Sequence, residues 1–559
     1  MTVRKALILA AGQGSRLGRL TERIPKPMLR VHNRPVLETH VRRLAEAGVW
    51  NIWINLHHAP GPIREWFGDG SRFGVRIHYS EEEHLLGTSG ALRKLSGEFC
   101  SGLFFVVYGD NYMELDYGAL GSGRRGLVTL LAHHRDYVAE SGVLEIAADN
   151  RILSFQEKPA PGTELSHWVN AGVYVCQPAM LDYLPPGESD FARDVFPRML
   201  QDRCELYASI STVPVGPLDT KEMLEATDPL WVAQIGAGKI GARRAALFSK
   251  VAVVADIDTE RASSLAAPYG ARAVSRWEEA VDDERVRIVS VATTNDLLAP
   301  VARRALESGR HVLVEKPAAL RPSDLEPLAA LARERSLIYQ AGFNYRFHPA
   351  IRKARALLDE GAIGRLLHGA ARHGHGGRLG LENEWRARPE LAGGGELLDQ
   401  GVHLIDLARY LSGAEVAGVQ AMLRTDFWPV QPLEDHALVW LEFEGGARFS
   451  IEVSLTQWKN LFYFELVGEQ GTIAVEGLGG SYGPERLTLV RRPPQFGAPE
   501  VLTETFDNPD QCWAEQWEAM ERAIRCGEPV NGGVSDALAC LRVIEACRRS
   551  SVERRMVEP

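Results

Sequence analysis

Two glycine-rich loops constrain this sequence most, one near its start and one far inside it. The first is Ala10-Ala-Gly-Gln-Gly-Ser-Arg16 and the second is Ile235-Gly-Ala-Gly-Lys-Ile-Gly241. Each loop follows an apolar run typical of a buried strand and precedes a helical pattern, the setting in which glycine loops bind phosphate groups. The sequence therefore predicts two nucleotide sites, and we interpret the chain as two enzymes joined together.

Composition argues against several classes of partner. The chain has 559 residues, of which 45% are hydrophobic, and a net charge of -10 with acidic and basic residues mixed along it. It can build more than one core, and it has no basic stripe that would gather nucleic acid phosphates. No stretch approaches the roughly 20 apolar residues that span a bilayer. We therefore predict neither a nucleic acid nor a membrane partner.

The cysteines and the N-terminus indicate the compartment. Seven cysteines are scattered without any C-x-x-C pair, a pattern that favours reduced thiols over a disulfide framework or a zinc site. The N-terminal apolar run is too short for a signal peptide and leads directly into the first glycine loop. We expect a cytoplasmic protein.

Apolar segments alternate with helical patterns through the first half of the chain. The segments are Ala6–Ala10, Pro35–Ala47, Ile52–Leu56, Phe104–Tyr108, Leu127–Ala132 and Val173–Cys176. This alternation predicts an α/β fold with a mostly parallel sheet covered by helices. Ligands of such sheets bind beyond the carboxyl ends of the strands, where the first glycine loop lies.

The first loop and a nearby lysine suit a triphosphate. Gly12 and Gly14 allow backbone N–H groups to approach the phosphates closely, and Arg16 can spread its charge over the departing pyrophosphate. Two prolines bracket Lys26, and a lysine held in this way can bind the α-phosphate. A proline-bracketed surface lysine is the alternative for that motif alone, but the two motifs together favour a phosphate site.

Six motifs, in order, resemble the sugar-1-phosphate nucleotidylyltransferases over residues 1 to about 226. They are Gly12-Gln-Gly-Ser-Arg-Leu17, Pro25-Lys-Pro-Met28, Leu86-Gly-Thr-Ser-Gly-Ala91, Gly109-Asp110, Glu157-Lys-Pro159 and Asn170-Ala-Gly172. The resemblance implies a Rossmann-like, GT-A-like mixed sheet. It also implies Mg²⁺-assisted attack of a sugar 1-phosphate on the α-phosphorus of a nucleoside triphosphate, which needs positioning and charge neutralisation.

The resemblance also assigns metal and nucleotide residues. Asp110, just after the strand Phe104–Tyr108, is expected to bind Mg²⁺ because hard oxygen ligands suit that ion. Asp219 is the expected second ligand, although the Gly-Thr pair usual in the family is missing here, and a local rearrangement would weaken catalysis. Gly87 and Thr88 are expected to contact the substrate.

The sugar side follows from the same resemblance. Glu157 is expected to hold a sugar hydroxyl, Lys158 the sugar phosphate, and Asn170 the sugar ring. A surface Glu/Lys pair is the alternative for the first two.

Glu82 is the residue expected to read the nucleobase. It lies before Gly87, near the place where relatives read the base edge. A carboxylate only accepts hydrogen bonds, and guanine offers it two adjacent donors. The sequence therefore favours GTP, with CTP as the second choice, and a solvated acidic turn is the alternative.

The second loop has the spacing of a dinucleotide fingerprint, with glycines for a tight turn, for pyrophosphate approach and for helix packing. The strand Val251–Ala255 ends in Asp256, which can accept hydrogen bonds from the ribose hydroxyls and repel a 2′-phosphate. We therefore expect NAD(H) rather than NADP(H). The loop residues expected at this cofactor are Gly236, Gly238, Lys239, Ile240 and Gly241.

Later motifs resemble the Gfo/Idh/MocA family over residues 230–559. They are Val291-Ala-Thr-Thr294, His311-Val-Leu-Val-Glu-Lys-Pro317, Gly342-Phe-Asn-Tyr-Arg-Phe-His-Pro349 and Gly393-Gly-Gly-Glu-Leu-Leu-Asp-Gln-Gly-Val-His403. The resemblance implies a Rossmann domain and then an α/β domain whose open, mostly antiparallel sheet supports a homo-oligomer, a dimer or a tetramer. Further cofactor contacts are expected from Thr293, Asn295, Glu315 and Lys316. The expected domains are 1–228, 229–348 and 349–559.

Three residues carry the expected oxidation chemistry. An alcohol must lose its hydroxyl proton while hydride leaves, and histidine has a suitable pKa for taking that proton. Asp399 and His403 are four residues apart, so on a helix they would share one face and the carboxylate would stabilise the protonated imidazole. Lys316 could polarise the reacting oxygen. The family resemblance makes these three a triad and suggests a cis Lys316–Pro317 bond.

Residues around this triad could bind the substrate. His373 and His375 flank a glycine, which indicates a mobile loop near the substrate rather than a zinc site. A second group of residues could bind a polar or phosphorylated substrate, and packing or surface pairing is an equal alternative for it. That group is Tyr345, Arg346, Trp385 and Arg386.

Two functions remain open from the sequence. The first is a bifunctional enzyme that makes an activated sugar or cyclitol by nucleotidylyl transfer and NAD-dependent oxidation or reduction. The second is a chain in which one half, more readily the N-terminal one because of the altered Asp219 region, is a silent nucleotide sensor or scaffold.

Overall fold

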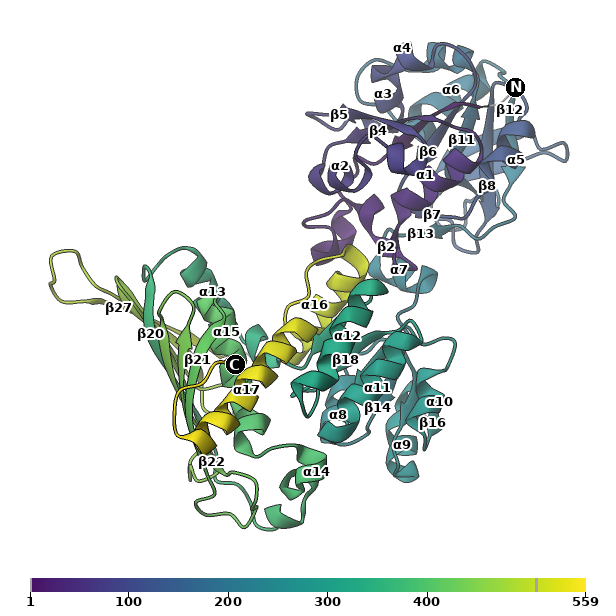
Figure 1. Cartoon of the computed structure of the whole chain (residues 1–559). Coiled ribbons are helices and arrows are strands. Elements are labelled where there is room, and N and C mark those ends of the chain that lie inside the picture. The colour runs from purple at the N-terminus through teal and green to yellow at the C-terminus, as the bar shows by residue number, and fades with distance from the viewer. Residues whose placement is uncertain (1–2, 508–510) are drawn as a thin grey trace. The chain divides into compact units, whose positions relative to one another are not determined.

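The computed structural model describes residues 3–507 and 511–559, which fold into two units (Figure 1). The first unit comprises Met1–Pro229 with Ile524–Gly527, and the second comprises Leu230–Ala523 and Glu528–Pro559. In the described part of the chain, no helix has the length and apolarity that a membrane span needs.

A mixed sheet forms the centre of the first unit, in the order β10-β9-β11-β6-β1-β4-β5, with β8 beside β11 and β12 beside β8. Strands β1, β4, β5 and β6 are parallel, whereas β11 is antiparallel to β6, β8 and β9. The predicted mixed sheet is confirmed, and the expectation of a mostly parallel one is wrong. The strands are β1 (Lys5–Leu9), β4 (Asn51–Leu56), β5 (Arg76–Glu81), β6 (Phe104–Tyr108), β8 (Val128–His134), β9 (Gly142–Ile146), β10 (Ile152–Glu157), β11 (Trp168–Cys176) and β12 (Leu206–Ile210).

Both faces of this sheet are covered because its strands are apolar on both sides. In β1, Ala6 and Ile8 enter one core while Leu7 and Leu9 enter another, as the alternation of a strand requires. The helices of this unit are α1 (Val36–Glu46), α2 (Gly61–Phe67), α3 (Gly87–Lys94), α4 (Ser96–Phe99), α5 (Tyr117–Ser122), α6 (Phe196–Gln201) and α7 (Lys221–Thr227).

Small ribbons complete the unit. Strand β2 (Arg30–Val31) pairs with β3 (Arg34–Pro35), and β7 (Asn111–Tyr112) pairs with β13 (Gly216–Pro217). The second ribbon joins the chain just after β6 to the chain just before α7. Residues 110 and 219, far apart in sequence, are thereby brought close together.

The second unit begins with a parallel sheet in the order β16-β15-β14-β17-β18-β19, which is the doubly wound order of dinucleotide-binding folds. The strands are β14 (Val232–Ile235), β15 (Val251–Ala255), β16 (Arg272–Val274), β17 (Ile288–Val291), β18 (His311–Val314) and β19 (Tyr339–Ala341). The helices between them are α8 (Lys239–Ala245), α9 (Thr259–Ala266), α10 (Trp277–Val281), α11 (Asn295–Glu307) and α12 (Pro322–Glu334).

The rest of the second unit is an open sheet in the order β21-β22-β23-β20-β24-β25-β26-β27. Only its β20–β23 pair is parallel among the described strands, so the mostly antiparallel sheet is confirmed. The strands are β20 (Leu366–Gly374), β21 (Val416–Arg424), β22 (His436–Phe443), β23 (Arg448–Ser454), β24 (Leu461–Gly468), β25 (Gly471–Glu476), β26 (Glu485–Arg491) and β27 (Glu500–Phe506). The helices are α13 (Pro349–Asp359), α14 (Pro389–Ala392), α15 (Val402–Ser412), α16 (Cys512–Cys526) and α17 (Val534–Glu553).

Candidate functional sites

A cavity of about 470 Å³ opens at the carboxyl ends of β1, β4 and β6 in the first unit. It lies where ligands of α/β sheets bind. Several of the predicted nucleotide residues line it: Gly12, Gly14, Arg16, Lys26, Glu82, Gly87, Thr88, Asp110 and Asp219.

Backbone geometry explains the glycines at this cavity. Gly14 has a φ of +62°, and Gly87 has a φ of +74° with a Cβ position only 2.3 Å from the backbone oxygen of Ser189. A side chain at Gly12 would instead enter open space. The loop therefore leaves room for a ligand at Gly12, while the other two glycines are required by the fold.

Lys26 lies between the two predicted metal ligands. Its Nζ is 2.8 Å from Asp110 Oδ2 and 2.7 Å from Asp219 Oδ1, and only 5% of the residue is exposed. Burial opposes its charge, but the two carboxylates outweigh burial and raise the pKa of Lys26. Burial likewise opposes the charge of Asp219, and Lys26 nevertheless lowers the pKa of that carboxyl. The altered segment around Asp219 thus still reaches the cavity.

Arg16 approaches the same carboxylate from the loop. Its guanidinium is 3.4 Å from Asp219 Oδ1 and 3.1 Å from Glu140 Oε2, and the side chain is exposed. Thr88 is held at the start of α3, since its N–H and hydroxyl both donate to Asp190 Oδ1 at 3.0 Å. Positive and hydrogen-bonding groups therefore face the cavity from several elements.

Glu82 lines the cavity, but its carboxylate already has protein partners. Oε1 accepts from Asn55 Nδ2 at 2.8 Å, and Oε2 accepts from the Leu86 N–H at 3.1 Å. Asn55 in turn accepts from the Ala10 N–H at 2.7 Å. Glu82 and Asn55 therefore form a joined polar pair, and the base-reading role of Glu82 stays a prediction. Asn55 was missed, although a polar residue within the apolar strand Asn51–Leu56 was a usable signal.

The predicted sugar residues lie outside the set that lines this cavity. Glu157 and Lys158 are exposed at the end of β10. Asn170 donates to Tyr174 Oη at 2.7 Å and accepts from the Gly172 N–H at 3.0 Å. Their roles stay predictions.

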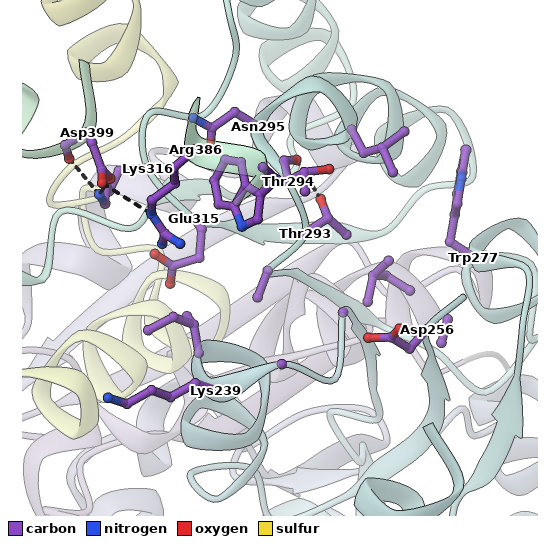
Figure 2. Close-up of a pocket in the computed structure, with 18 of the residues that line it drawn as sticks. Lys239, Asp256, Trp277, Thr293, Thr294, Asn295, Glu315, Lys316, Arg386 and Asp399 are labelled. Atoms are coloured by element: carbon purple, nitrogen blue, oxygen red, sulfur yellow. Dashed lines mark hydrogen bonds and ion pairs between the residues drawn. The ribbon is translucent and has the colours of Figure 1, made fainter. Parts of the chain in front are cut away.

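A second cavity, of about 520 Å³, opens at the carboxyl ends of β14, β15, β17 and β18 (Figure 2). Each strand delivers residues to it from the turn that follows. The predicted residues that line it are Gly236, Gly238, Lys239, Ile240, Asp256, Thr293, Asn295, Glu315, Lys316, Tyr345, Trp385, Asp399 and His403.

The second glycine loop is tight for a structural reason. Gly236 has a φ of +87°, and a Cβ at Gly241 would lie 1.9 Å from the Gly236 oxygen. Gly238 has open space around its Cβ position. These three environments match the turn, packing and phosphate-approach roles of the fingerprint.

Asp256 is oriented by the backbone around it. Its Oδ2 accepts from the Ala237 N–H at 2.7 Å and its Oδ1 from the Asp258 N–H at 2.9 Å. Across the cavity, Glu315 accepts from Arg244 Nε at 2.8 Å. The cavity therefore presents fixed carboxylates at two places along its length.

Lys316 and Asp399 form the ion pair at the other end of this cavity, with Arg386 beside it (Figure 2). Asp399 lies in a π-helical turn over Leu397–Gly401, and its Oδ2 also accepts from Arg386 Nε at 3.3 Å. Burial acts against its charge, but Lys316 and Arg386 outweigh burial and hold the pKa of Asp399 well below its ordinary value. The Lys316–Pro317 bond is cis, as expected.

His403 lies in the first turn of α15 and is 4% exposed. Its Nδ1 has no hydrogen-bond partner among the described residues. Burial, and then Lys316, hold the pKa of His403 well below its usual value, although Asp399 acts in the opposite direction. Asp399 thus favours the protonated imidazole, as expected, but burial outweighs this one carboxylate.

The residues expected to grip the substrate separate into two groups. Tyr345 and Trp385 line the cavity, and the Arg386 guanidinium lies 4.5 Å from the Trp385 ring centre. His373 lies on β20 rather than in a mobile loop and is 2% exposed. Glycines surround His373 in the sequence, so the local pattern did not indicate a strand.

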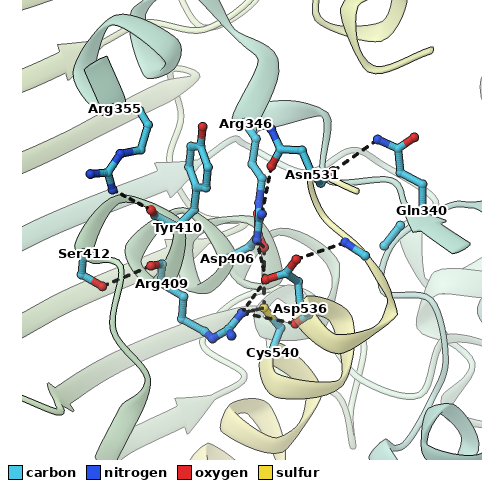
Figure 3. A network of polar contacts seen from close by, with 12 residues as sticks. Gln340, Arg346, Arg355, Asp406, Arg409, Tyr410, Ser412, Asn531, Asp536 and Cys540 are labelled. Carbon is cyan, nitrogen blue, oxygen red and sulfur yellow. Dashed lines mark hydrogen bonds and ion pairs between the residues drawn. The ribbon is translucent and has the colours of Figure 1, made fainter. Parts of the chain in front are cut away.

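Arg346 is part of a buried network instead of the substrate site (Figure 3). Its guanidinium makes two bonds to Asp406, at 2.6 and 2.8 Å, and also contacts Asp536 at 3.0 Å and Asn531 at 3.1 Å. It is 4% exposed. The expectation of a substrate-binding Arg346 is wrong, since the side chain is buried against Asp406 and does not line the cavity.

Some residues that line the second cavity, or that contact its lining residues, were not predicted. Arg244 of α8 holds Glu315, and Trp513 of α16 packs its ring 4.2 Å from that guanidinium. Trp277 of α10 lines the cavity near Asp256. No local motif marks them, because their places depend on how distant elements pack.

Comparison with known families matches the part of the chain around each cavity to a different family. Residues 5–214 match the family described as nucleotidyl transferase. Residues 230–343 match the oxidoreductase family with an NAD-binding Rossmann fold, and residues 351–474 match the GFO/IDH/MocA C-terminal domain.

Individual relatives cover one unit each. A UTP–glucose-1-phosphate uridylyltransferase of Synechocystis is 35% identical over 36% of this chain and 57% of its own length. A levoglucosan dehydrogenase of Pseudarthrobacter phenanthrenivorans is 30% identical over 40% of this chain and 63% of its own length. This chain thus spans less than two thirds of either relative. The solved structure of a levoglucosan dehydrogenase with NADH and levoglucosan has a TM-score of 0.54 and 25% identity, covering 59% of this chain and 99% of that one.

Proposed function

We propose that this chain is a bifunctional enzyme of activated-sugar or cyclitol synthesis, because its first unit matches the nucleotidyl transferase family and its second matches the Gfo/Idh/MocA oxidoreductases. The first unit transfers a nucleoside monophosphate to a sugar 1-phosphate and releases pyrophosphate. The second oxidises or reduces a sugar or cyclitol hydroxyl with NAD. The observation that carries the proposal is that each glycine loop opens into a cavity with charged groups suited to its reaction. We divide the chain into domains 1–228, 229–348 and 349–559.

In the first unit, cationic side chains and backbone N–H groups bind the triphosphate. Backbone N–H groups of the loop approach the phosphates, while Arg16 and Lys26 neutralise their charge. Asp110 and Asp219 supply the hard oxygen ligands that fit Mg²⁺. When bound, that ion neutralises further phosphate charge.

For the base we propose GTP, with CTP as the alternative, through the Glu82–Asn55 pair at the cavity wall. A carboxylate accepts from the two donors of guanine, and an amide adds both donor and acceptor. The named relative that uses UTP makes a panel of nucleotides the direct test.

A silent first unit is the competing function, suggested by the missing Gly-Thr after Asp219. The contacts of Asp219 and Asp110 with Lys26 favour an active enzyme instead. Activity in the first unit distinguishes the two.

We expect the purified protein, given Mg²⁺, a panel of sugar 1-phosphates and each nucleoside triphosphate, to release pyrophosphate fastest with GTP. Asp110→Asn should lower the rate about 100-fold or more, because a charged metal ligand is lost. Asp136→Asn, at an exposed carboxylate, is the matched control. Silence of the wild-type protein across the whole panel would support the sensor function.

In the second unit, Lys316 and His403 handle the substrate hydroxyl. Asp399 fixes the Lys316 ammonium, which can donate to the reacting oxygen, and the neutral imidazole of His403 can accept the hydroxyl proton. Bound NAD⁺ supplies the hydride acceptor. Asp256, which lines the same cavity, would accept hydrogen bonds from the ribose hydroxyls of NAD and repel the 2′-phosphate of NADP.

We expect Lys316→Ala and His403→Ala each to lower NADH formation from the alcohol substrate about 100-fold or more, since each removes a proton-transfer group. NAD affinity, measured by fluorescence quenching, should change little. Lys353→Ala, at an exposed lysine of α13, is the control. Turnover near the wild-type rate in both variants would remove this mechanism.

A further inference from the structure

A parallel ring stack lies beside the Lys316–Asp399 pair. Tyr345 comes from a short 3₁₀ turn over Asn344–Phe347, and its ring centre is 4.0 Å from that of His403, with 11° between the ring planes. Both residues line the second cavity. The face of a phenol ring therefore covers the imidazole that the proposed mechanism uses.

The Tyr345 hydroxyl contacts a second histidine. It lies 3.2 Å from Nε2 of His373 on β20. A phenol hydroxyl donates to a neutral imidazole nitrogen, so Nε2 is the acceptor and the His373 proton belongs on Nδ1. Burial, and then His375 and Lys316, lower the pKa of His373 to about 3. The acceptor consequently persists throughout the neutral pH range.

The surroundings of His403 make its cationic form costly. The charged or titratable groups that act on it are Lys316, His373, Asp399 and His348, and of these only Asp399 favours the imidazolium. Phe343 adds an edge-on ring at 6.3 Å. The proton taken from a substrate hydroxyl therefore needs further stabilisation, and an aromatic face can supply it.

We propose that Tyr345 is a positioning residue whose ring face stabilises protonated His403 during alcohol oxidation, and that His373 fixes the ring in that place. The inference rests on the proposed oxidoreductase activity of the second unit. In that step the substrate O–H and C–H bonds break, the proton moves to His403, the hydride leaves for bound NAD⁺, and a carbonyl forms. Because the Tyr345 hydroxyl donates a hydrogen bond to His373, the phenol ring gains electron density, which strengthens its attraction for a cation.

The test compares removal of the ring with removal of the hydroxyl. Tyr345→Leu should lower kcat about 5- to 30-fold and move the acid limb of the kcat/KM profile down by about 0.5 to 1 pH unit, because the imidazolium loses its aromatic face. Tyr345→Phe keeps the stack, so its loss should be about threefold or less. Tyr345→Met is a second stack-removing variant with an unbranched chain, in case the first one fails to bind NAD.

His373 gives a double-mutant cycle with the hydroxyl. His373→Phe should lose about as much activity as Tyr345→Phe, and the double variant should lose no more than either one, because both remove one hydrogen bond. His373→Gln restores an acceptor and should recover most of the rate. Phe427→Leu, at an exposed ring of the same unit, is the control for aromatic loss and should retain the wild-type profile.

The outcomes separate this inference from the function on which it rests. If the wild-type protein oxidises no sugar or cyclitol with NAD⁺, both fall. If it does, and Tyr345→Leu and Tyr345→Met keep the acid limb at its wild-type position, the ring-face role alone is overturned. Equal losses from Tyr345→Phe and Tyr345→Leu would also overturn it.

Discussion

Single charged residues in both units are held by partners that fix their direction. Lys26 is clamped by two carboxylates, and Lys316 is clamped by one. Breaking such a pair on one side costs more than the pair contributes, because the remaining charge stays partly buried. Pre-set directions of this kind lower the reorganisation that binding a phosphate or a hydroxyl would otherwise require.

Asp256 gives a prediction at this scale. Asp256→Ser should weaken NAD binding about 10- to 100-fold, because a charge-assisted bond to ribose is lost. Binding of NADP should weaken less or improve, since the negative charge that repels a 2′-phosphate is gone. Isothermal titration with both dinucleotides measures the ratio.

The control for Asp256 is Glu260→Gln, an exposed carboxylate on the neighbouring helix α9. It should change neither affinity. Equal weakening of NAD and NADP by Asp256→Ser would contradict the selectivity assigned to this carboxylate.

At the scale of elements, Arg346 ties together a turn and two helices. Its guanidinium joins the Asn344–Phe347 turn to Asp406 of α15 and Asp536 of α17, and Arg409 of α15 also reaches Asp536 at 3.4 Å. Burial opposes its charge, but Asp406 and Asp536 outweigh burial and raise the pKa of Arg346. The turn that carries Tyr345 is therefore held in place by α15 and α17.

Arg346→Ala should lower the free energy of unfolding of the second unit by about 3–5 kcal/mol, because it leaves Asp406 buried without its main partner. Pulse proteolysis in urea, with peptides of α15 and α17 as the readout, measures the loss in this unit. Arg542, also on α17, makes an exposed pair with Glu326 of α12, and Arg542→Ala should cost about 1 kcal/mol or less. Similar losses in the two variants would show that the network is not a buried anchor.

The whole molecule consists of two units that carry separate cores, so its unfolding is not expected to be a single two-state transition. Each unit also holds buried neutral histidines. His40 of α1 lies in the first unit, where its Nδ1 is 2.8 Å from Tyr117 Oη and its Nε2 is 2.7 Å from the Asn111 oxygen. Burial lowers the pKa of His40 to about 4.

This shift predicts acid sensitivity of the first unit. Below the unfolded-state pKa of about 6.5, the unfolded chain binds a proton that folded His40 refuses, so stability falls as pH falls. Down to about pH 4, the wild-type protein should lose up to about 1.4 kcal/mol per pH unit relative to His40→Gln. Pulse proteolysis in urea, with peptides of β1 and β6 as the readout, measures this slope. Parallel pH dependences in the two proteins would contradict it.

Local patterns were sufficient for the parts of this protein that depend on neighbouring residues. The two glycine loops required backbone conformations that few other residues adopt, as the φ values at Gly14 and Gly236 confirm. Apolar runs predicted strands such as Phe104–Tyr108 with its bounds unchanged. The predicted dimer or tetramer through the C-terminal sheet stays a prediction.

Long-range packing decided what those patterns left open. The β7–β13 ribbon brings Asp219 close to Asp110. Asn55 donates a hydrogen bond to the carboxylate of Glu82. Arg346 is buried in an ion pair with Asp406. Burial also lowers the pKa of His403 against the effect of Asp399. Desolvation and the choice of charge partner depend on residues from distant elements. A motif can therefore identify a functional side chain, but not the surroundings that determine its protonation state.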